Sequence, residues 1–439
     1  MNLTKCIITN LFGHFTYTIE FNKSVTLIHG LNGCGKTTIL KMIDALFNSR
    51  TDILRGIEFS EMRVYFDDDS AITIIRKEHT LNSPRILDKY WTLDFELFKN
   101  GKVQKFSDES GHIDPDHFFR HGGLPSYIKM VSDNQWRDSR RGLVYSTEEL
   151  IDNYGPRIMR MIEEESYIPH EIEEILQSIK VTFISSDRLT IQKRIERSYG
   201  DDIIRVEQRV DDIAKSLAEL MGKAIQKYAQ ISQSKDQTFP MRAIHEPNPL
   251  PIEQIRERLA VLEQKRKELI DNGILEEEHY IDIGEILESI TEKDRSILSL
   301  YTVDTEEKLN VLAEVSTQIN LFRKIIETNF SGKKMVFSQK EGFYFESIFD
   351  GRKIKASSLS SGEQHELVMF YDLIFETHNN STVLIDEPEL SLHIKWQLDF
   401  IAELQEIIRL SSFQIIIATH SPQIIHDNWD ITVSLASGE

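Results

Sequence analysis

Cysteine and long apolar stretches are scarce in this sequence. Its 439 residues include only two cysteines, Cys6 and Cys34, which excludes a disulfide scaffold and a cysteine zinc cluster and suits a reducing cytoplasm. No segment approaches the ~18 consecutive apolar residues of a membrane span. The first residues, Met1 to Lys5, lack the apolar core of a signal peptide. We therefore expect a cytoplasmic protein with no membrane contact.

Positive charge is the other shortage. There are 51 lysines and arginines against 71 aspartates and glutamates, a formal net charge of −20, which argues against non-specific binding to nucleic acid. A local basic groove stays compatible with this balance, because exposed charges are screened beyond ~8–10 Å. Two basic clusters are candidates for a surface that faces DNA or a partner protein, with solvated loops as the alternative. Their residues are Arg137, Arg140, Arg141, Lys193, Arg194 and Arg197.

The remaining composition is that of an ordinary globular protein. Hydrophobic residues make up 40% and charged residues 28%, and the length allows two or three domains with a large core. Apolar alternation predicts a hairpin within residues 1–23, a β side sheet within 61–107 and a further hairpin within 334–346. Residues 108–150 show no clear period and predict a loop-rich insertion.

Residues 200–330 predict a mainly helical insertion. Apolar residues spaced three and four apart begin at Ile252, and a second helix is expected to start near Asp304, with Glu307 completing a capping box. The two helices are candidates for a short antiparallel hairpin. An ordinary helical lid is the alternative.

The stretch from Gly30 to Thr37 matches the phosphate-binding pattern G-x-x-x-x-G-K-[ST] without a mismatch. A short buried strand precedes it and a helix follows it, which is the order that a phosphate cradle needs. Its glycines let backbone N–H groups turn toward phosphate oxygens. Lys36 can reach the β- and γ-phosphates, and the Thr37 hydroxyl can bind Mg²⁺. Phe12 or Phe15 is a candidate for stacking on adenine, with core packing as the alternative.

A second group of motifs follows residue 355. Ser360, Gly362 and Glu363 stand at the start of a predicted helix, where a hydroxyl and free N–H groups can bind an anion. A plain helix cap is the alternative. An apolar strand then ends in Asp386, placed to hold Mg²⁺, and in Glu387, placed to polarise the attacking water.

A last apolar strand ends in His420. The order of phosphate loop, Ser-Gly-Glu helix, Asp-Glu strand and His strand resembles that of the ABC-type ATPase heads, the group that includes SMC proteins, RecF and the OLD nucleases. The resemblance covers roughly residues 1–100 and 335–435 and implies ATP and Mg²⁺ as cofactors. It makes His420 a switch histidine that senses the γ-phosphate. It also implies a homodimer or higher homo-oligomer in which two heads close over ATP.

The resemblance carries over motif by motif. Gly30 to Thr37 resembles the Walker A loop, Leu359 to Gln364 the signature motif, Asp386 and Glu387 the Walker B pair, and Glu389 to His393 the D-loop. The Q-loop contact is assigned to Gln192, with Ser185 or Arg188 as alternatives. The implied nucleotide-binding residues are Asn32, Gly33, Gly35, Lys36, Thr37, Thr38, Gln192, Ser360, Gly362 and Glu363. The implied metal ligands are Thr37 and Asp386, and the implied catalytic residues are Glu387 and His420.

These motifs predict an α/β fold, a P-loop NTPase of ABC type. Its mixed sheet is built from both chain ends, beside a β side lobe and a mainly helical insertion with a short helical hairpin. The expected divisions are the N-terminal part of the head at 1–107, a loop-rich and helical insertion at 108–180, a Q-loop-like strand and loop at 181–192, a helical insertion at 193–333, and the C-terminal part of the head at 334–439.

The signature helix LSSGEQHELVMFYDLIF and the segment LIDEPELSLHIKWQ are most similar to the PtuA ATPases of Septu antiphage systems, some of them retron-linked. The ATPase of the PARIS defence system is a close rival. The resemblance implies an ATP-hydrolysing subunit that controls a separate nuclease subunit of HNH type. Residues 421–439 are too few for the Toprim nuclease domain of OLD proteins, so we expect any nuclease on another chain. The alternatives are a RecF- or SMC-like DNA-repair clamp without a nuclease partner, and an OLD-type enzyme truncated before its nuclease domain.

Overall fold

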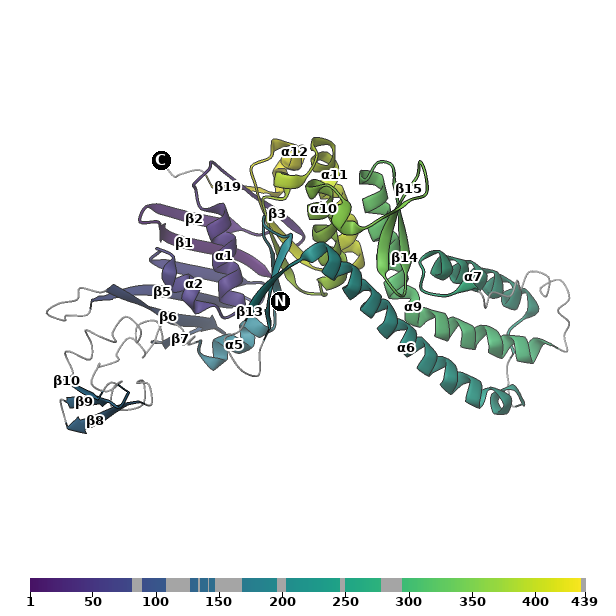
Figure 1. Ribbon diagram of the computed structural model, residues 1–439, viewed down its shortest axis with the longest axis horizontal. Coiled ribbons are helices and arrows are strands. Elements are labelled where there is room, and N and C mark those ends of the chain that lie inside the picture. The colour runs from purple at the N-terminus through teal and green to yellow at the C-terminus, as the bar shows by residue number, and fades with distance from the viewer. Residues whose placement is uncertain are drawn as a thin grey trace. The chain divides into compact units, whose positions relative to one another are not determined.

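The structure is a computed structural model that describes residues 1–80, 89–107, 127–132, 135–140, 142–146, 168–195, 203–244, 249–277 and 294–435. The chain forms two compact units, here named the phosphate-loop unit and the helical unit. The first comprises Met1–Ser186, Thr377–Glu389 and Ser411–Glu439, and the second comprises Asp187–Glu376 and Leu390–Leu410. The purple strands near the N-terminus and the yellow strands near the C-terminus in Figure 1 both belong to the phosphate-loop unit. The domain boundaries expected from the sequence stay a prediction.

A five-stranded parallel sheet forms the centre of the phosphate-loop unit. Its strands, in spatial order, are β11 (Val181–Ile184), β17 (Thr382–Asp386), β18 (Gln414–Thr419), β3 (Val25–His29) and β19 (Thr432–Ser434). Every residue of β17 and β18 is buried, as expected for parallel strands covered on both faces. The sheet therefore joins segments from both ends of the chain, as predicted.

An antiparallel sheet of six strands forms the β side lobe of the same unit. Its strands are β2 (Phe15–Glu20), β1 (Leu3–Leu11), β4 (Glu61–Phe66), β5 (Ala71–Thr80), β6 (Lys89–Lys99) and β7 (Lys102–Phe106). Along β4, intermediate and buried residues alternate strictly, which is the pattern of a half-buried strand. The predicted N-terminal hairpin and side sheet are confirmed.

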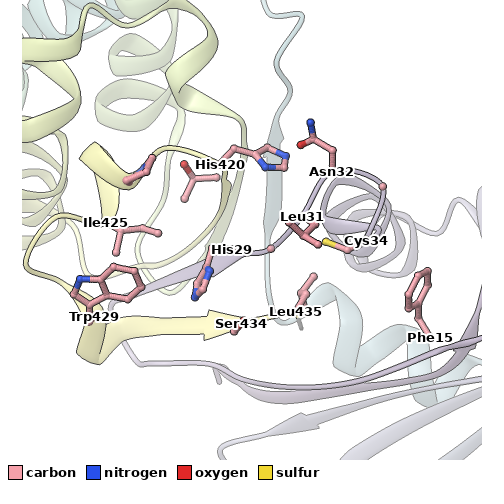
Figure 2. Close-up of a pocket in the computed structure, with 14 residues that line it drawn as sticks. Phe15, His29, Leu31, Asn32, Cys34, His420, Ile425, Trp429, Ser434 and Leu435 are labelled. Atoms are coloured by element: carbon pink, nitrogen blue, oxygen red, sulfur yellow. The ribbon is translucent and has the colours of Figure 1, made fainter. Parts of the chain in front are cut away.

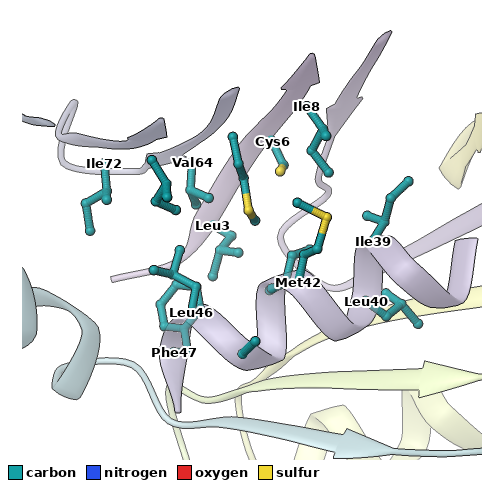
Figure 3. Close-up of a cluster of buried hydrophobic side chains, with 14 of the residues drawn as sticks. Leu3, Cys6, Ile8, Ile39, Leu40, Met42, Leu46, Phe47, Val64 and Ile72 are labelled. Atoms are coloured by element: carbon teal, nitrogen blue, oxygen red, sulfur yellow. The ribbon is translucent and has the colours of Figure 1, made fainter. Parts of the chain in front are cut away.

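The core of the phosphate-loop unit lies between the side lobe and helix α1 (Lys36–Phe47), which is followed by the short helix α2 (Thr51–Gly56). Figure 3 shows Met42 and Leu46 of α1 directed toward Leu3 on β1 and Val64 on β4. These four side chains are at most 1% exposed. Full burial of such a side chain contributes roughly 1.5–3 kcal/mol, so this packing fixes the helix that starts inside the phosphate loop.

The insertion after residue 107 contains regular structure where it is described. Three antiparallel strands, β8 (Ile128–Ser132), β9 (Gln135–Asp138) and β10 (Leu143–Ser146), form a small sheet, and α5 (His170–Gln177) follows. The prediction of a loop-rich segment is wrong for these residues. β8 has one buried residue and β10 has none, so these strands carry little of the apolar alternation that marks a half-buried strand.

The helical unit begins with the hairpin of β12 (Thr190–Ile195) and β13 (Ile203–Gln208), and long helices follow in its described residues. These are α6 (Arg209–Ile244), α7 (Ile252–Asp271) and α9 (Arg295–Asn329). The sheet of β14 (Lys333–Ser338), β15 (Gly342–Ser347) and β16 (Lys353–Ile354) follows. The unit also contains α10 (Ser361–Tyr371) and α11 (Ile394–Leu410). The predicted helical insertion and the hairpin within 334–346 are confirmed.

The helical hairpin differs from the predicted one. On α9, Asp304 bonds to Arg242 of α6 and Lys308 bonds to Asp236, so residue numbers fall along α6 as they rise along α9. These two helices are therefore antiparallel.

Helix α7 also packs on α9, but it runs in the same direction as α9. The amide of Leu250, just before α7, bonds to Ser299, and Asn272 at its far end bonds to Ser316. Residue numbers rise together, so α7 and α9 run parallel. The prediction of an antiparallel α7–α9 pair is wrong, because apolar spacing defines a buried face but not the direction of its partner.

The predicted helix start near Asp304 is also wrong. Helix α9 begins at Arg295, and Asp304 lies inside it, 3% exposed. Its carboxylate accepts two hydrogen bonds of 2.7 Å from Arg242. Burial alone would raise the pKa of Asp304, but Arg242 and Lys235 lower it overall. The spacing of Asp304 and Glu307 resembles that of a capping box. In the structure, both carboxylates instead form ion pairs with α6.

Candidate functional site

The ends of three parallel strands bring the predicted nucleotide residues together. The register pairs Asp386 of β17 with Ala418 of β18, and Thr419 of β18 with His29 of β3. The carboxyl ends of all three strands therefore meet at one edge of the sheet. Ligands of open parallel sheets bind at this edge.

The phosphate loop between β3 and α1 depends on two glycines with left-handed backbone. Gly33 and Gly35 have φ of 83° and 93°, a region that costs other L-residues roughly 1–2 kcal/mol. A Cβ on Gly35 would also lie 3.0 Å from Leu11 and 3.2 Å from Phe12. The loop therefore lies directly on the β1–β2 hairpin, and this packing leaves no room for a side chain at position 35.

Lys36 is held inside its own loop. Its Nζ donates to the carbonyl oxygens of Gly30 and Leu31 at 3.0 and 3.2 Å, and the residue is 5% exposed. A buried ammonium needs such partners. The phosphate oxygens of a nucleotide would replace these carbonyl oxygens as acceptors.

Thr37 and Asp386 meet across the loop. The Thr37 hydroxyl donates to Asp386 Oδ1 at 2.9 Å. A hydroxyl and a carboxylate are the hard oxygen ligands that Mg²⁺ prefers, and this ion is often held by one or two protein oxygens together with substrate phosphates. Among the described residues, no group of three or more His, Cys, Asp or Glu side chains is arranged to hold a metal by itself. The pair fits an Mg²⁺ ion shared with a nucleotide.

His420 lies between Lys36 and Glu387, the residue that follows β17. Its Nδ1 is 3.2 Å from Lys36 Nζ, and its Nε2 is 3.5 Å from Glu387 Oε1. An ammonium can only donate, so Nδ1 accepts from Lys36, and Nε2 is the ring nitrogen that faces Glu387. Lys36, His420 and Glu387 thus form one polar chain at the strand edge.

Glu387 has an unusual backbone. Its φ of 45° lies in the left-handed region, which is rare for residues other than glycine and is often found at functional sites. Its N–H donates to the carbonyl oxygen of Ala418 at 2.9 Å. This bond holds the sharp turn after Asp386 that separates the two acidic side chains.

Glu389 positions the end of β18, a role that the sequence reasoning missed. Its carboxylate accepts from the Thr419 hydroxyl at 3.0 Å and from the backbone N–H of His420 at 2.5 Å. The sequence marked Glu389 only as the start of the D-loop. No local spacing signals this contact, because its partners lie on another strand.

A cavity of about 330 Å³ in the phosphate-loop unit is lined by Lys36, Thr37, Glu387 and His420. It includes eight of the predicted site residues together with Phe12. Phe15 lines a different cavity, so of the two candidates for adenine stacking only Phe12 faces the phosphate cavity. The residues that line the phosphate cavity are Phe12, Asn32, Gly33, Gly35, Lys36, Thr37, Thr38, Glu387 and His420.

A second cavity of about 570 Å³ adjoins the loop and shares Asn32, Gly33 and His420 with the first. Figure 2 shows Trp429 and His29 toward one end of it and Phe15 at the other, with Leu31 and Cys34 between them. The His29 and Trp429 rings meet edge to face at 5.8 Å. The apolar share of its lining is larger than that of the phosphate cavity.

The signature residues belong to the helical unit. Ser360 caps α10: its hydroxyl accepts from the Glu363 N–H at 3.3 Å, and Glu363 accepts from the Ser360 N–H at 3.0 Å. This capping box places Gly362 in the first turn of the helix. Ser360 thus forms the helix cap that was the alternative interpretation, and contact between Ser360 and a nucleotide stays a prediction.

The remaining predicted residues are described in part. Gln192 pairs with Val206 in the β12–β13 ladder, while its side chain and those of Lys193 and Arg194 lie outside the described residues, as do Arg141 and Arg197. The guanidinium of Arg140 stacks on the Tyr127 ring at 4.0 Å, and Arg137 is exposed. Arg188, an alternative for the Q-loop, is 6% exposed and donates to the sulfur of Met369.

The parallel sheet, the glycine loop around Lys36 and the acidic strand end define a P-loop ATPase. The chain belongs to the AAA ATPase domain family, whose family model matches residues 1–425. No helix within the described ranges is both long and apolar enough to cross a membrane.

Several solved structures of SMC heads are similar to this chain. The Smc head domain of Pyrococcus furiosus, with an extended coiled coil and bound to the C-terminal domain of ScpA, is 14% identical, with 96% of this chain and 90% of that chain covered and a TM-score of 0.36. An SmcHead bound to the C-winged helix domain of ScpA is 12% identical, with 97% and 91% covered and a TM-score of 0.35. The SMC head domain from Thermotoga maritima is 12% identical, with the same coverage and a TM-score of 0.31.

Proposed function

We propose that this chain is the Mg²⁺-dependent ATPase subunit of an antiviral defence complex and that its nucleotide state controls a separate nuclease subunit. The observation that carries the ATPase chemistry is the single cavity in which Lys36, Thr37, Glu387 and His420 meet, with Asp386 bonded to Thr37. The defence role rests on the resemblance of the signature and Walker B segments to the PtuA ATPases of Septu systems.

In this proposal the phosphate loop binds the triphosphate. Backbone N–H groups at Gly33 and Gly35 and the start of α1 donate to phosphate oxygens. Lys36 exchanges its two carbonyl acceptors for the β- and γ-phosphates. Thr37 and Asp386 are the residues that would hold Mg²⁺, which when bound neutralises part of the phosphate charge.

Hydrolysis is assigned to Glu387 and His420. Glu387 orients the attacking water, because its carboxylate lines the cavity while its backbone is fixed by Ala418. His420 contacts both Lys36 and Glu387, which supports its role as the residue that would detect the γ-phosphate. Loss of that phosphate on hydrolysis would change both contacts.

A second subunit completes the site in this proposal. ATP brings several negative charges, which Lys36 and Mg²⁺ neutralise only in part. The capped N-terminus of α10 offers N–H donors and the positive end of a helix dipole. Two heads that close over ATP would place Ser360 of one against the nucleotide of the other, and subunit contact would then depend on nucleotide state.

The test is co-purification of this chain with the product of the neighbouring gene, followed by mass measurement. A stable complex with an HNH-type protein, whose nuclease activity differs between wild type and Lys36→Ala, is the expected result. A nuclease activity unaffected by Lys36→Ala would overturn the control role. Absence of a nuclease partner, combined with ATP-dependent binding to DNA, would favour the RecF- or SMC-like clamp.

A further inference from the structure

Helix α10 carries two acidic residues close behind its predicted phosphate-binding end. Glu363 and Glu366 are three residues apart and lie on one side of the helix. With a rise of 1.5 Å per residue, Glu366 lies only ~9 Å along the axis from Ser360. Negative charge at that range opposes the binding of a phosphate at the helix N-terminus. Both carboxyl groups therefore need to be neutralised.

Glu363 is neutralised by a cation. Lys333 of β14 donates to its Oε1 at 2.6 Å, while Oε2 accepts from the Ser360 N–H at 3.0 Å. Burial by itself would raise the pKa of Glu363, but the hydrogen bonds from Lys333 and Ser360 lower it overall. This residue is thus an ion-paired carboxylate.

Glu366 has a different environment. It is fully buried, and none of the described lysines, arginines or histidines forms an ion pair with it. Its Oε1 accepts a hydrogen bond from the side-chain amide of Asn329, at the last residue of α9. Its Oε2 is buried and has no hydrogen-bond partner in the part of the chain that the structure describes. An ionised carboxylate in such a place is costly, so a neutral acid fits it better.

The same amide also links α10 to α11. Asn329 Nδ2 donates to Glu403 Oε1 at 3.2 Å as well as to Glu366. One amide group thus connects two acids, which repel each other when both are ionised.

The charged groups around this pair come from all the adjoining elements. On α10 they include Glu363, and on α11 they include Asp399 and Glu406, with Lys324 contributed by α9. Burial raises the pKa of Glu366 to about 8 and that of Glu403 to about 7. Neutral pH therefore lies close to the range in which the pair changes its protonation.

We propose that Glu366 is a positioning residue of the ATPase reaction. As an uncharged acid, it joins the signature helix α10 to α9 and α11 through Asn329, and it places no negative charge behind Ser360. The inference rests on the proposed role of Ser360 at the nucleotide. Because α9 ends at Asn329, the long helices α6 and α9 connect through this contact to the phosphate-binding end of α10.

The experiment compares Glu366→Gln, Glu366→Ala and the control Glu314→Gln, which changes an exposed acid on α9. Steady-state ATPase rates are measured from pH 6.5 to 9.5. For wild type and the control we expect kcat to fall ~10-fold as Glu366 ionises, with a KM for ATP that stays within ~2-fold because Lys36 is unaffected. Glutamine is a neutral isostere, so Glu366→Gln should keep its rate at pH 9. Alanine leaves Asn329 without its acceptor and should lower kcat at every pH.

Two outcomes overturn the inference. One is a Glu366→Gln variant with the alkaline loss of wild type, and the other is a Glu366→Gln variant as slow at pH 7 as Glu366→Ala. If Glu366→Ala does not fold, the pH profile of the glutamine variant decides alone. Neither outcome touches the ATPase proposal, which fails only if Lys36→Ala and Ser360→Arg leave hydrolysis unchanged.

Discussion

At the scale of single residues, Glu387 shows how backbone geometry serves chemistry. Its left-handed φ of 45° is held by the bond of its N–H to Ala418. Asp386 directly before it stays in the buried strand and bonds to Thr37. The two neighbouring carboxylates therefore reach different partners, Thr37 for Asp386 and His420 for Glu387.

We predict that Glu387→Gln binds ATP with wild-type affinity and hydrolyses it roughly 100-fold more slowly. The amide preserves size and contact with His420 but is a poor acceptor for a proton from water, and such a loss typically costs 10²–10⁴ in rate. Single-turnover hydrolysis and equilibrium binding of ATP measure the two effects separately. Unchanged turnover would remove Glu387 from this role.

We predict that Gly35→Ala destabilises the protein more than Gly33→Ala. Both substitutions place an L-residue at positive φ, which costs about 1–2 kcal/mol. Only the Cβ at position 35 would press on Leu11 and Phe12, whereas nothing lies within 4 Å of one at position 33. Overpacking of this kind adds typically 1–3 kcal/mol. Thermal unfolding of the two variants side by side checks the order, and equal losses would contradict the predicted close packing.

At the scale of elements, the helical unit depends on polar contacts at helix ends. Asp304 ties α9 to α6 through Arg242, and Asn272 ties the end of α7 to Ser316 of α9. Breaking a buried pair by removing one partner is strongly destabilising. These contacts show that α6 runs antiparallel to α9 and that α7 runs parallel to it.

We predict that the free energy of unfolding falls as pH rises from about 5 to about 8. Below its ordinary pKa of 4.5, Glu366 is protonated in both the folded and the unfolded chain, and above that value only the folded chain, with the pKa raised to about 8, keeps the proton. Stability falls with pH where the folded state binds more protons. Each pKa unit corresponds to ~1.4 kcal/mol, so the loss is on the order of a few kcal/mol.

Urea denaturation at pH 5, 6.5 and 8 measures this loss. Glu366→Gln should show a smaller pH dependence than wild type, because it has no proton to lose at this position. Glu314→Gln should retain the wild-type dependence. A glutamine variant with the full wild-type slope would show that another group causes it.

At the scale of the whole molecule, the residues predicted to bind the nucleotide are found in both units. Walker A, Walker B and His420 belong to the phosphate-loop unit, and Ser360 belongs to the helical unit. A shared site between subunits would use this division, since each head would supply one part to its partner. The proposal therefore makes activity a property of an assembly.

We predict that mixing two inactive variants, Lys36→Ala and Ser360→Arg, restores part of the ATPase activity. Each mixed dimer built with shared sites contains one site with both changes and one with neither. Lys36→Ala alone should lose ATP binding, while Lys41→Ala, an exposed lysine on the same helix, is the matched control. Mixed dimers verified by mass that stay inactive would contradict the shared site, as would monomers with the full rate.

The sequence by itself determined the class of fold and indicated a P-loop ATPase. Gly30 to Thr37 is a local pattern that matches the phosphate loop, and Asp386, Glu387 and His420 come at the ends of apolar runs that predict strands. Only the tertiary structure decided the parallel course of α7 and α9, the contact of Glu389 with His420, and the link from Asn329 to Glu366 and Glu403. These depend on pairings between distant segments, and hydrophobic period records which face of an element is buried but not what lies against it.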